Sequence, residues 1–146
     1  MTGIRCGFVA LVLLLPVAAL AIPFPTAQVQ YSWPLRLGGE FGLNFYQHSW
    51  YDPVAAPFVS VSAGRDGLGL NAGIKGTLSM FFLPVATAGI GASGLYLWED
   101  EDAAYAGARG SVSFSVLSVF SGAYRRISGD TRDEWLFSLG AGVGLP

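Results

Sequence analysis

The stretch 68–82 reads LGLNAGIKGTLSMFF and alternates between two kinds of residue. Its even positions are apolar or small, whereas its odd positions hold glycine and polar residues such as Asn71, Lys75 and Thr77 until Phe81. Successive side chains of a strand point to opposite faces, so one face of this strand is apolar and the other is small and polar. We therefore expect a strand of a membrane-spanning β-barrel, with its apolar face toward lipid and its polar face toward the lumen.

The same alternation recurs along most of the chain. Seven segments have it: 35–46, 58–63, 68–82, 85–98, 104–116, 117–127 and 134–145. Single-chain bacterial barrels have an even number of strands, so this count is one short. The segment 27–33 also alternates and is the first candidate for the missing strand, and a division of 68–82 is the alternative. We expect an all-β fold, an antiparallel up-and-down transmembrane β-barrel of about eight strands in sequential order.

One connection is predicted from a change of phase. Apolar residues occupy even positions up to Val116 and odd positions after it. A two-residue hairpin produces such a change, because the residues that flank its turn share a face but differ in parity. We therefore place a tight turn at Leu117 and Ser118, and a second short connection at Leu83 and Pro84.

Three longer connections are predicted. They are a proline-containing loop at 47–57, an acidic loop at 99–102 and a polar loop at 128–133. Outer-membrane barrels keep their short turns on the periplasmic side and their longer loops outside. We expect the loops 99–102 and 128–133 to face the cell exterior, and the C-terminus to face the periplasm.

The first 21 residues form a separate segment. Arg5 precedes an apolar run that is broken at Pro16 and followed by the A-x-A motif at 19–21. A basic start, an apolar run and a small-residue site are typical of a secretory signal peptide. We therefore expect residues 1–21 to be a signal peptide and residues 22–146 to be the outer-membrane β-barrel domain. An uncleaved anchor is the alternative, although the apolar run is barely long enough to span a bilayer.

The charge of the chain argues against nucleic acid as a partner. Eight basic and ten acidic residues give a formal net charge of −2, and loss of Arg5 on cleavage leaves seven basic residues. A duplex-binding protein carries a basic patch, and the only adjacent basic pair here is Arg125 and Arg126. The single cysteine, Cys6, precedes the cleavage motif, so no disulfide or cysteine nucleophile is expected in the mature chain.

Aromatic residues gather near the ends of the predicted strands. They are Trp33, Trp50, Trp98 and Trp135, with Tyr51, Tyr96, Tyr105 and Tyr124 close to them in sequence. Trp and Tyr are enriched where a barrel crosses the membrane–water interface, because the ring prefers hydrocarbon and its polar atom can hydrogen-bond. We expect these residues to form an aromatic girdle.

Four charged residues fall on the polar phase of the strands: Arg36, Glu40, Lys75 and Arg109. A basic side chain in hydrocarbon near the midplane would cost about 2–4 kcal/mol, so we place all four residues in the lumen. We expect Glu40 to pair with one or more of the three bases. Side chains fill the interior of an eight-stranded barrel, so the network is interpreted as structural, with a narrow ion or solute path as the alternative.

No catalytic, cofactor-binding or metal site is predicted. The acidic loop 99–102 lacks the alternating ligands, central glycine and distal glutamate of a calcium loop. His48 and Ser49, with Asp52 nearby, are the only candidates for a hydrolase site. Nearness in sequence is weak evidence for a catalytic triad, because a triad is defined by geometry. A lipid-directed hydrolase is therefore the alternative and not the favoured interpretation. We expect no enzyme activity and no cofactor.

The signal peptide, the glycine-rich sequential strands and the aromatic strand ends together resemble the small bacterial outer-membrane β-barrel proteins of the OmpA and OmpX type. The resemblance covers about residues 27–146 and is one of pattern. It implies a location in the bacterial outer membrane, contact with outer-membrane lipid and assembly by the barrel-assembly machinery. Members of this class usually end in an aromatic residue that this machinery recognises, whereas this chain ends with Leu145 and Pro146.

The resemblance leaves the role of the protein open. Members of this class are structural proteins, adhesins, lipid-modifying enzymes or narrow pores. For this chain we expect a structural or surface-interaction role, and no feature identifies a particular surface or periplasmic partner.

Two other fold classes remain as alternatives. The segment 76–98 contains 23 residues without a charge, which is long enough for a transmembrane helix of an inner-membrane protein. Pro84 and the period-two pattern argue against this helix. A soluble secreted β-sandwich is the other alternative, and a charged fraction of only 12% disfavours it.

Overall fold

The computed structural model describes residues 22–46, 54–80, 83–98, 102–129 and 134–145. The predicted signal peptide, residues 1–21, lies outside this part of the chain. The first strand begins at Ile22, the residue that follows the predicted cleavage motif.

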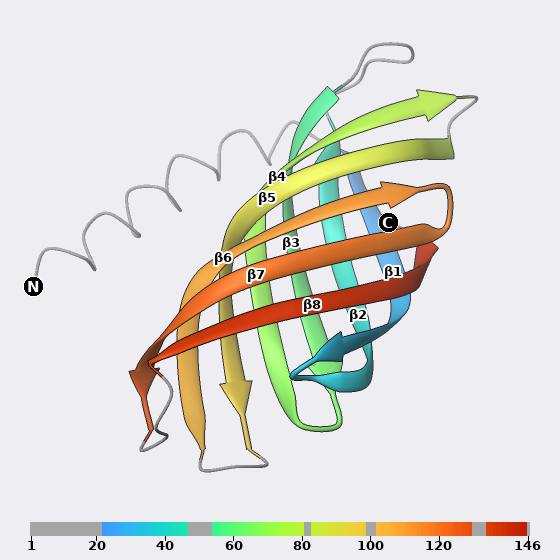
Figure 1. Ribbon diagram of the computed structural model, residues 1–146. Coiled ribbons are helices and arrows are strands. Elements are labelled where there is room, and N and C mark those ends of the chain that lie inside the picture. The colour runs from blue at the N-terminus through green and yellow to red at the C-terminus, as the bar shows by residue number, and fades with distance from the viewer. Residues whose placement is uncertain (1–21, 47–53, 81–82, 99–101, 130–133, 146) are drawn as a thin grey trace, which may run out of the picture.

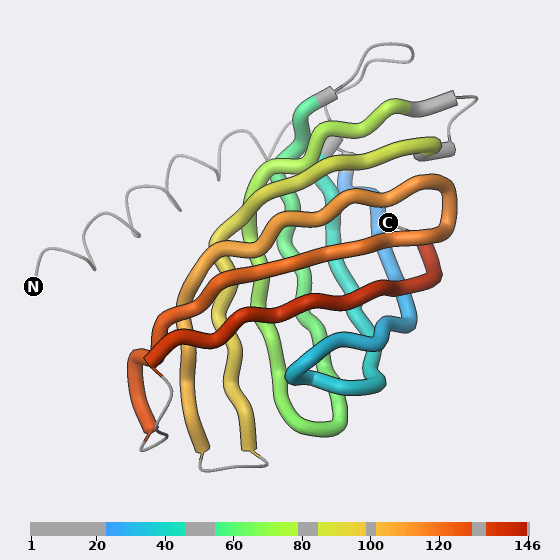
Figure 2. The backbone as a smooth tube through the Cα atoms, viewed as in Figure 1, coloured from blue at the N-terminus to red at the C-terminus, as the bar shows by residue number. Residues whose placement is uncertain are grey.

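The described residues form eight strands: β1 (Ile22–Trp33), β2 (Arg36–Tyr46), β3 (Val54–Gly64), β4 (Gly67–Met80), β5 (Leu83–Leu97), β6 (Ala103–Phe114), β7 (Leu117–Ser128) and β8 (Trp135–Leu145). Each strand pairs antiparallel with the next, and β8 pairs with β1, which closes the sheet into a barrel (Figure 1). The strands run obliquely around the barrel in chain order, as the backbone trace shows (Figure 2). The predicted all-β, antiparallel, eight-stranded barrel is confirmed.

Two open questions about the strands are answered by the pairing. The segment 27–33 belongs to β1, which pairs with both β2 and β8 and is therefore the missing strand. The segment 68–82 is not divided, because β4 runs without a break from Gly67 to Met80. The described residues of 76–98 lie mostly in β4 and β5, so the alternative of an inner-membrane helix there is wrong. Within the described residues, no helix is long and apolar enough to cross a membrane.

Three predicted boundaries are wrong. The strand β3 begins at Val54, inside the predicted loop 47–57, and Pro57 lies opposite Ile74 in the ladder. The strand β5 begins at Leu83, within the predicted short connection, and the chain joins β4 to β5 through residues 81–82. Proline lacks a backbone donor, but the pairing of β3 with β2 ends at Phe58, so Pro57 has no ladder partner on that side and lies at a local sheet edge.

The third error concerns the hairpin between β6 and β7. Its turn is at Ser115 and Val116, two residues before the predicted place, and it joins Phe114 to Leu117. Ser115 has a φ of 53°, a positive value of the kind that tight hairpin turns require. The phase argument is correct, since Phe114 and Leu117 both point outward. Val116 misled the placement because it continues the even apolar phase into the turn.

The connections divide the barrel into two distinct ends. One end carries the β1–β2 and β3–β4 turns and the β5–β6 and β7–β8 connections, and we call it the charged end. The other carries the first residue of β1, the last residue of β8 and the β6–β7 turn, and we call it the terminal end. The predicted loops 99–102 and 128–133 therefore extend from the charged end, opposite the C-terminus, whereas the predicted loop 47–57 falls between β2 and β3 at the terminal end. Of the two loops at the charged end, residues 99–101 and 130–133 lie outside the described part.

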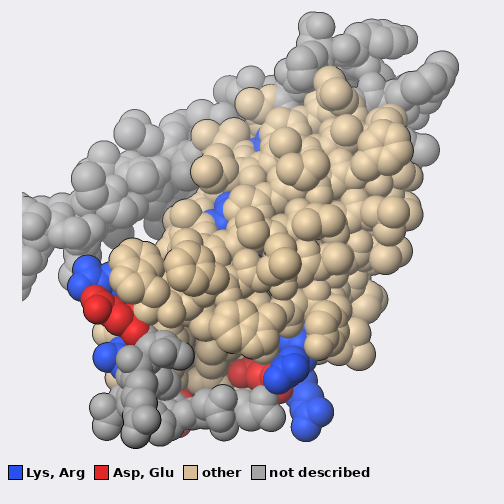
Figure 3. All heavy atoms as spheres, viewed as in Figure 1, with Lys and Arg blue, Asp and Glu red and all other residues tan. Residues whose placement is uncertain are grey.

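The polarity of the barrel is the inverse of that of a water-soluble protein. Among the side chains that face outward with roughly half or more of their surface exposed are Val29, Leu37, Phe41, Leu70, Ile74, Ile90, Val112, Phe114, Phe137 and Leu139. The buried inward side chains include Gln30, Asn44, Ser60, Ser62, Asn71, Thr77, Thr87, Ser93 and Ser113. The view in Figure 3 shows a wall that is almost free of charge above a rim where charged side chains gather.

Small residues on the inner face make room for the lumen's aromatic rings. A Cβ atom added to Gly140 would overlap the Phe120 ring and lie 2.6 Å from the Cβ of Ser32. A Cβ atom added to Gly122 would lie 2.6 Å from atoms of the Tyr124 ring. Both glycines face inward. Because they have no Cβ atom, the rings of Phe120 and Tyr124 fit beside them and fill the narrow lumen.

Candidate functional site

The polar lumen is the candidate functional site, and an ion pair lies at its centre. Glu40 on β2 and Arg109 on β6 meet across the barrel, with 2.7 Å between Glu40 Oε2 and Arg109 Nη2. Their side chains are 14% and 10% exposed. The alternation of each strand directs both residues inward, and the barrel's stagger brings them to the same height although they are 69 residues apart in the sequence.

The other two bases behave differently from each other. Lys75 on β4 also lies in the lumen, with its ammonium 5.2 Å from the centre of the Phe58 ring. Arg36 does not lie there: it has a φ of 62° at the start of β2, is half exposed, and pairs with Asp66 at 3.2 Å. The prediction of a lumenal position is therefore correct for Glu40, Lys75 and Arg109 and wrong for Arg36, because Arg36 adjoins the turn at the charged end.

Hydrogen bonds extend from Glu40 across four further strands. Ser60 donates to Glu40 at 2.8 Å, and Asn71 donates its amide to Ser60 at 3.1 Å. The Asn71 carbonyl oxygen accepts a bond from Ser93 at 2.5 Å, and Ser93 Oγ lies 3.3 Å from the Tyr124 hydroxyl. Buried polar groups are costly unless they are paired, and this chain of bonds satisfies groups from β2, β3, β4, β5 and β7.

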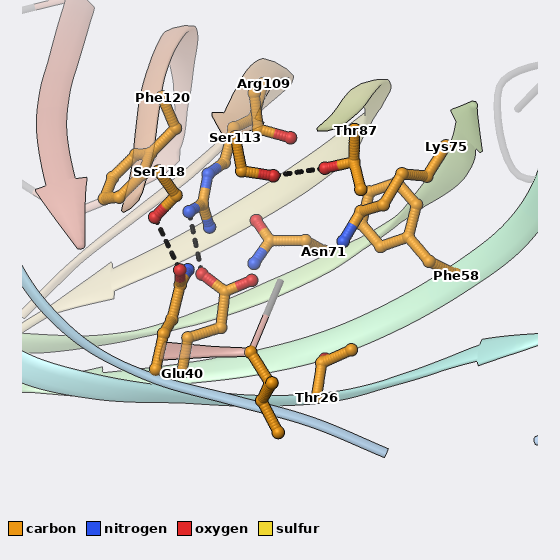
Figure 4. Close-up of a pocket in the computed structure, with 13 residues that line it drawn as sticks. Thr26, Glu40, Phe58, Asn71, Lys75, Thr87, Arg109, Ser113, Ser118 and Phe120 are labelled. Atoms are coloured by element: carbon orange, nitrogen blue, oxygen red, sulfur yellow. Dashed lines mark hydrogen bonds and ion pairs between the residues drawn. The ribbon is translucent and has the colours of Figure 1, made fainter. Parts of the chain in front are cut away.

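Two further side-chain bonds lie toward the terminal end. Ser118 on β7 donates to the side-chain amide oxygen Oε1 of Gln28 on β1 at 2.6 Å, and Thr87 on β5 bonds to Ser113 on β6 (Figure 4). The first of these passes over Gly142 of β8, the strand between β7 and β1, and the second joins residues that face each other in neighbouring strands. Together with the ion pair, these bonds connect most of the barrel wall from inside.

The arginine of the ion pair also rests on an aromatic ring. The guanidinium carbon of Arg109 is 3.9 Å from the centre of the Phe120 ring, within the range of a cation–π interaction. Figure 4 shows the guanidinium between this ring and Glu40. The guanidinium of Arg109 is thus held by the Glu40 carboxylate on one side and by the Phe120 ring on the other.

Apolar side chains close the lumen toward the charged end. Leu35 in the β1–β2 turn is only 5% exposed and belongs to a cluster with Leu95, Ala103, Tyr105, Tyr124 and Leu136. We call this cluster the apolar layer. Tyr105 and Tyr124 were predicted to be part of the aromatic girdle, and this is wrong, because both are buried in the apolar layer at 4% and 1% exposure.

The cavities inside the described barrel are small. One of about 30 Å³ is lined by Lys75, Arg109, Glu40 and several hydroxyl side chains, and another of about 10 Å³ adjoins Gln30, Ser32 and Ser62. These volumes hold about one or two water molecules. The described lumen is a packed interior rather than a wide passage.

Charged and aromatic side chains together form the rim of the charged end. Arg125 pairs with Glu134 at 2.8 Å, and both are exposed. Trp33, Trp98 and Trp135 are each about half exposed at this end, and the Trp98 indole donates to the Arg65 carbonyl oxygen at 2.8 Å. These three tryptophans, with Tyr96, occupy the positions that the girdle prediction requires, whereas Trp50 and Tyr51 lie outside the described residues.

The predicted hydrolase candidates His48, Ser49 and Asp52 also lie outside the described residues. Of the acidic loop, Asp102 is described, and its Oδ1 accepts a bond from the Tyr96 hydroxyl at 3.1 Å. Among the described residues, no group of three His, Cys, Asp or Glu side chains is placed to hold a metal ion.

Sequence reasoning missed three aromatic residues of the lumen, although a signal for them was present. Phe58, Phe120 and Tyr124 share the parity of the serines and glycines in their strands, which is the inward parity. Their apolar character drew attention away from this position.

No family model, curated protein or solved structure matches this chain.

Proposed function

We propose that this chain is a bacterial outer-membrane β-barrel protein that anchors a charged rim at the cell surface, with a structural or surface-interaction role and no catalysis. The observation that supports this best is the inverse polarity of the barrel. Monomeric water-soluble proteins rarely expose an apolar surface of more than a few hundred Å² in one patch. Here large apolar side chains point outward from each of the eight strands.

Lipid is the proposed environment of this outer wall. A closed barrel pairs its backbone groups between strands and has no free edge, so it meets the requirement for crossing hydrocarbon. The described charged residues lie in the lumen or at the charged end, where lipid does not contact them. The tryptophans at the charged end are placed where a membrane–water interface favours them.

The sealed interior favours an anchor over a pore. The apolar layer, the Glu40–Arg109 ion pair and the hydrogen-bonded serines fill the lumen at successive heights. By analogy with the OmpA and OmpX type of barrel, the terminal end faces the periplasm and the charged end faces outward. Outer-membrane lipid and the barrel-assembly machinery are then its expected partners.

The test is the behaviour of residues 22–146 with and without detergent. We expect a β-type circular dichroism spectrum in detergent micelles, and an electrophoretic mobility that changes when the sample is boiled, because a closed barrel resists the detergent until it is heated. Planar bilayers containing the refolded protein are expected to stay non-conducting. A helix-dominated spectrum, or a monomer that stays folded and soluble in plain buffer, would refute the proposal.

A further inference from the structure

The lumen contains one positive charge more than its ion pair accounts for. Between the apolar layer and the terminal end, the described side chains with charge are Glu40, Lys75 and Arg109. Arg109 is paired with Glu40, whereas no carboxylate of the described residues forms an ion pair with Lys75. Lys75 is the only lysine of the chain. Glu40 is the carboxylate that acts on Lys75, and it is already paired with Arg109. A largely enclosed ammonium that shares its only carboxylate with a guanidinium is unfavourable, so this charge calls for a further compensating group.

The surroundings of Lys75 are suited to an anion. The cavity of about 30 Å³ is lined by Lys75 and Arg109 together with the hydroxyl side chains of Thr26, Thr87, Ser111, Ser113 and Ser118 and the amides of Gln28 and Asn71. Glu40 also lines it, but its Oε2 is paired with Arg109 and its Oε1 accepts a hydrogen bond from Ser60. Ammonium, guanidinium, hydroxyl and amide groups all offer hydrogen-bond donors. Figure 4 shows Lys75 extending along the Phe58 ring toward Asn71, on the side of the lumen where Thr87 and Ser113 meet.

The cavity also limits the size of its occupant and the direction of access. Its volume equals that of about two water molecules, which admits a monatomic ion and excludes a sulfate or a bulky carboxylate. Thr26, Thr87, Ser113, Ser118 and Leu145 place the cavity in the half of the lumen next to the terminal end. The apolar layer separates it from the charged end.

We propose that this cavity is a binding site for a small monovalent anion of the size of chloride, held by Lys75 and reached from the terminal end. The anion neutralises the excess charge of the lumen and accepts hydrogen bonds from the cavity's hydroxyl groups. This site adds a ligand to a lumen otherwise explained as packing, and it does not depend on where the protein is located.

The direct test uses ³⁵Cl nuclear magnetic resonance on the detergent-solubilised barrel. Chloride that exchanges with a protein site has a broadened line, and competition with a larger ion of equal ionic strength isolates the specific part. Lys75→Gln is expected to weaken binding by about ten-fold or more, since it removes a desolvated charge partner. Arg65→Gln is the matched control: it removes one positive charge from a side chain that is 80% exposed at the charged end, and it is expected to leave the broadening unchanged.

The single lysine provides a second measurement that needs no variant. In protein labelled with ¹⁵N-lysine, only Lys75 gives signals, and these are expected to shift in a saturable way with chloride but not with gluconate at equal ionic strength. Equal broadening of the chloride line by the native protein and by Lys75→Gln overturns the proposal. An equal loss of broadening in Lys75→Gln and Arg65→Gln also overturns it. Lysine signals that respond identically to chloride and gluconate overturn it even where Lys75→Gln does not fold.

Discussion

At the scale of single residues, glycine decides how closely the inner face of the barrel can pack. Gly140 lies under the Phe120 ring, and Phe120 in turn supports the guanidinium of Arg109. The absence of one Cβ atom on β8 therefore determines where the ion pair can lie. Gly110, in contrast, points outward, and a Cβ atom there would come no closer than 3.8 Å to a backbone oxygen.

The first prediction compares these two glycines. Gly140→Ala is expected to destabilise the barrel by about 1–3 kcal/mol, because the added methyl group overpacks the lumen. Gly110→Ala has open space around its new methyl group and is expected to change stability by less than about 0.5 kcal/mol. Urea unfolding of both variants in lipid vesicles, followed by tryptophan fluorescence, measures the difference. Equal stability of the two variants would contradict the packing of Phe120 over Gly140.

The ion pairs of the lumen and the rim offer a second comparison. Glu40–Arg109 and Arg125–Glu134 have almost the same length, 2.7 and 2.8 Å, but only the second is exposed to solvent. Glu40→Gln leaves Arg109 charged and buried, and is expected to cost about 3–5 kcal/mol. Glu134→Gln is expected to cost less than about 1 kcal/mol, because an exposed pair is screened by water and salt.

The double variant Glu40→Gln/Arg109→Gln completes this comparison. It removes both charges and is expected to recover part of the loss, since no unpaired charge remains in the lumen. The same unfolding measurement applies to all three variants. A cost for Glu40→Gln that is no larger than that for Glu134→Gln would show that the lumenal pair is solvated.

The sequence predicted the face on which each lumenal charge lies, but not its partner. Period two assigns Glu40, Lys75 and Arg109 to the inner face without any knowledge of the fold. Which base meets Glu40 depends on the stagger of the three strands between β2 and β6, and this information is not local. Arg36 shares the same parity, but it adjoins a two-residue turn and pairs with Asp66 across the charged end. Parity alone cannot distinguish a strand interior from a strand end.

At the scale of strands and turns, the number and order of the elements followed from the pattern, while their ends did not. An unbroken phase predicted that β4 is one strand, and a change of phase predicted the hairpin between β6 and β7. The turn itself contains Ser115 and Val116, neither of which is a typical turn residue. A β-branched residue in a turn is compatible with the fold because the hairpin is determined by pairing of the long strands on each side.

The turns also supply the prediction for orientation. Arg65 lies in the β3–β4 turn at the charged end, and Ser115 lies in the β6–β7 turn at the terminal end. In a Cys6→Ser background, cysteine substituted for Arg65 is expected to react with a membrane-impermeant maleimide on intact cells. Cysteine substituted for Ser115 is expected to react only after the outer membrane is permeabilised, because short turns beside the termini face the periplasm.

Labelling that is reversed between these two positions would mean that the barrel is inserted the other way round. Labelling at both positions on intact cells would contradict a membrane-spanning barrel. Both side chains are exposed, so failure to react reports the membrane rather than burial in the protein. Ser118, two residues beyond the turn, is unsuitable because it faces the lumen and bonds to Gln28.

At the scale of the whole molecule, the outer wall is the part whose stability depends on the surrounding medium. The packing of the lumen, the turns and the ion pairs would be the same in a water-soluble barrel of this topology. The outer wall would differ, because exposed apolar side chains promote aggregation in water, whereas in lipid they stabilise the barrel. The central claim is therefore that the middle of the wall contacts hydrocarbon.

Two isoleucines of nearly equal exposure allow this claim to be tested directly. Ile90 lies at the middle of β5 and is 69% exposed, whereas Ile127 lies beside the end of β7 and is 68% exposed. In a bilayer, Ile90→Arg is expected to destabilise the barrel by about 2–4 kcal/mol, and Ile127→Arg, near the interface, by about 0–1 kcal/mol. In a water-soluble barrel, both exposed substitutions would change stability by less than about 0.5 kcal/mol.

The decisive measurement is reversible unfolding of Ile90→Arg and Ile127→Arg in lipid vesicles, each compared with the native chain. A cost for Ile90→Arg that exceeds the cost for Ile127→Arg by about 2 kcal/mol is the result that a wall embedded in lipid predicts. Equal and small costs for the two variants would contradict it.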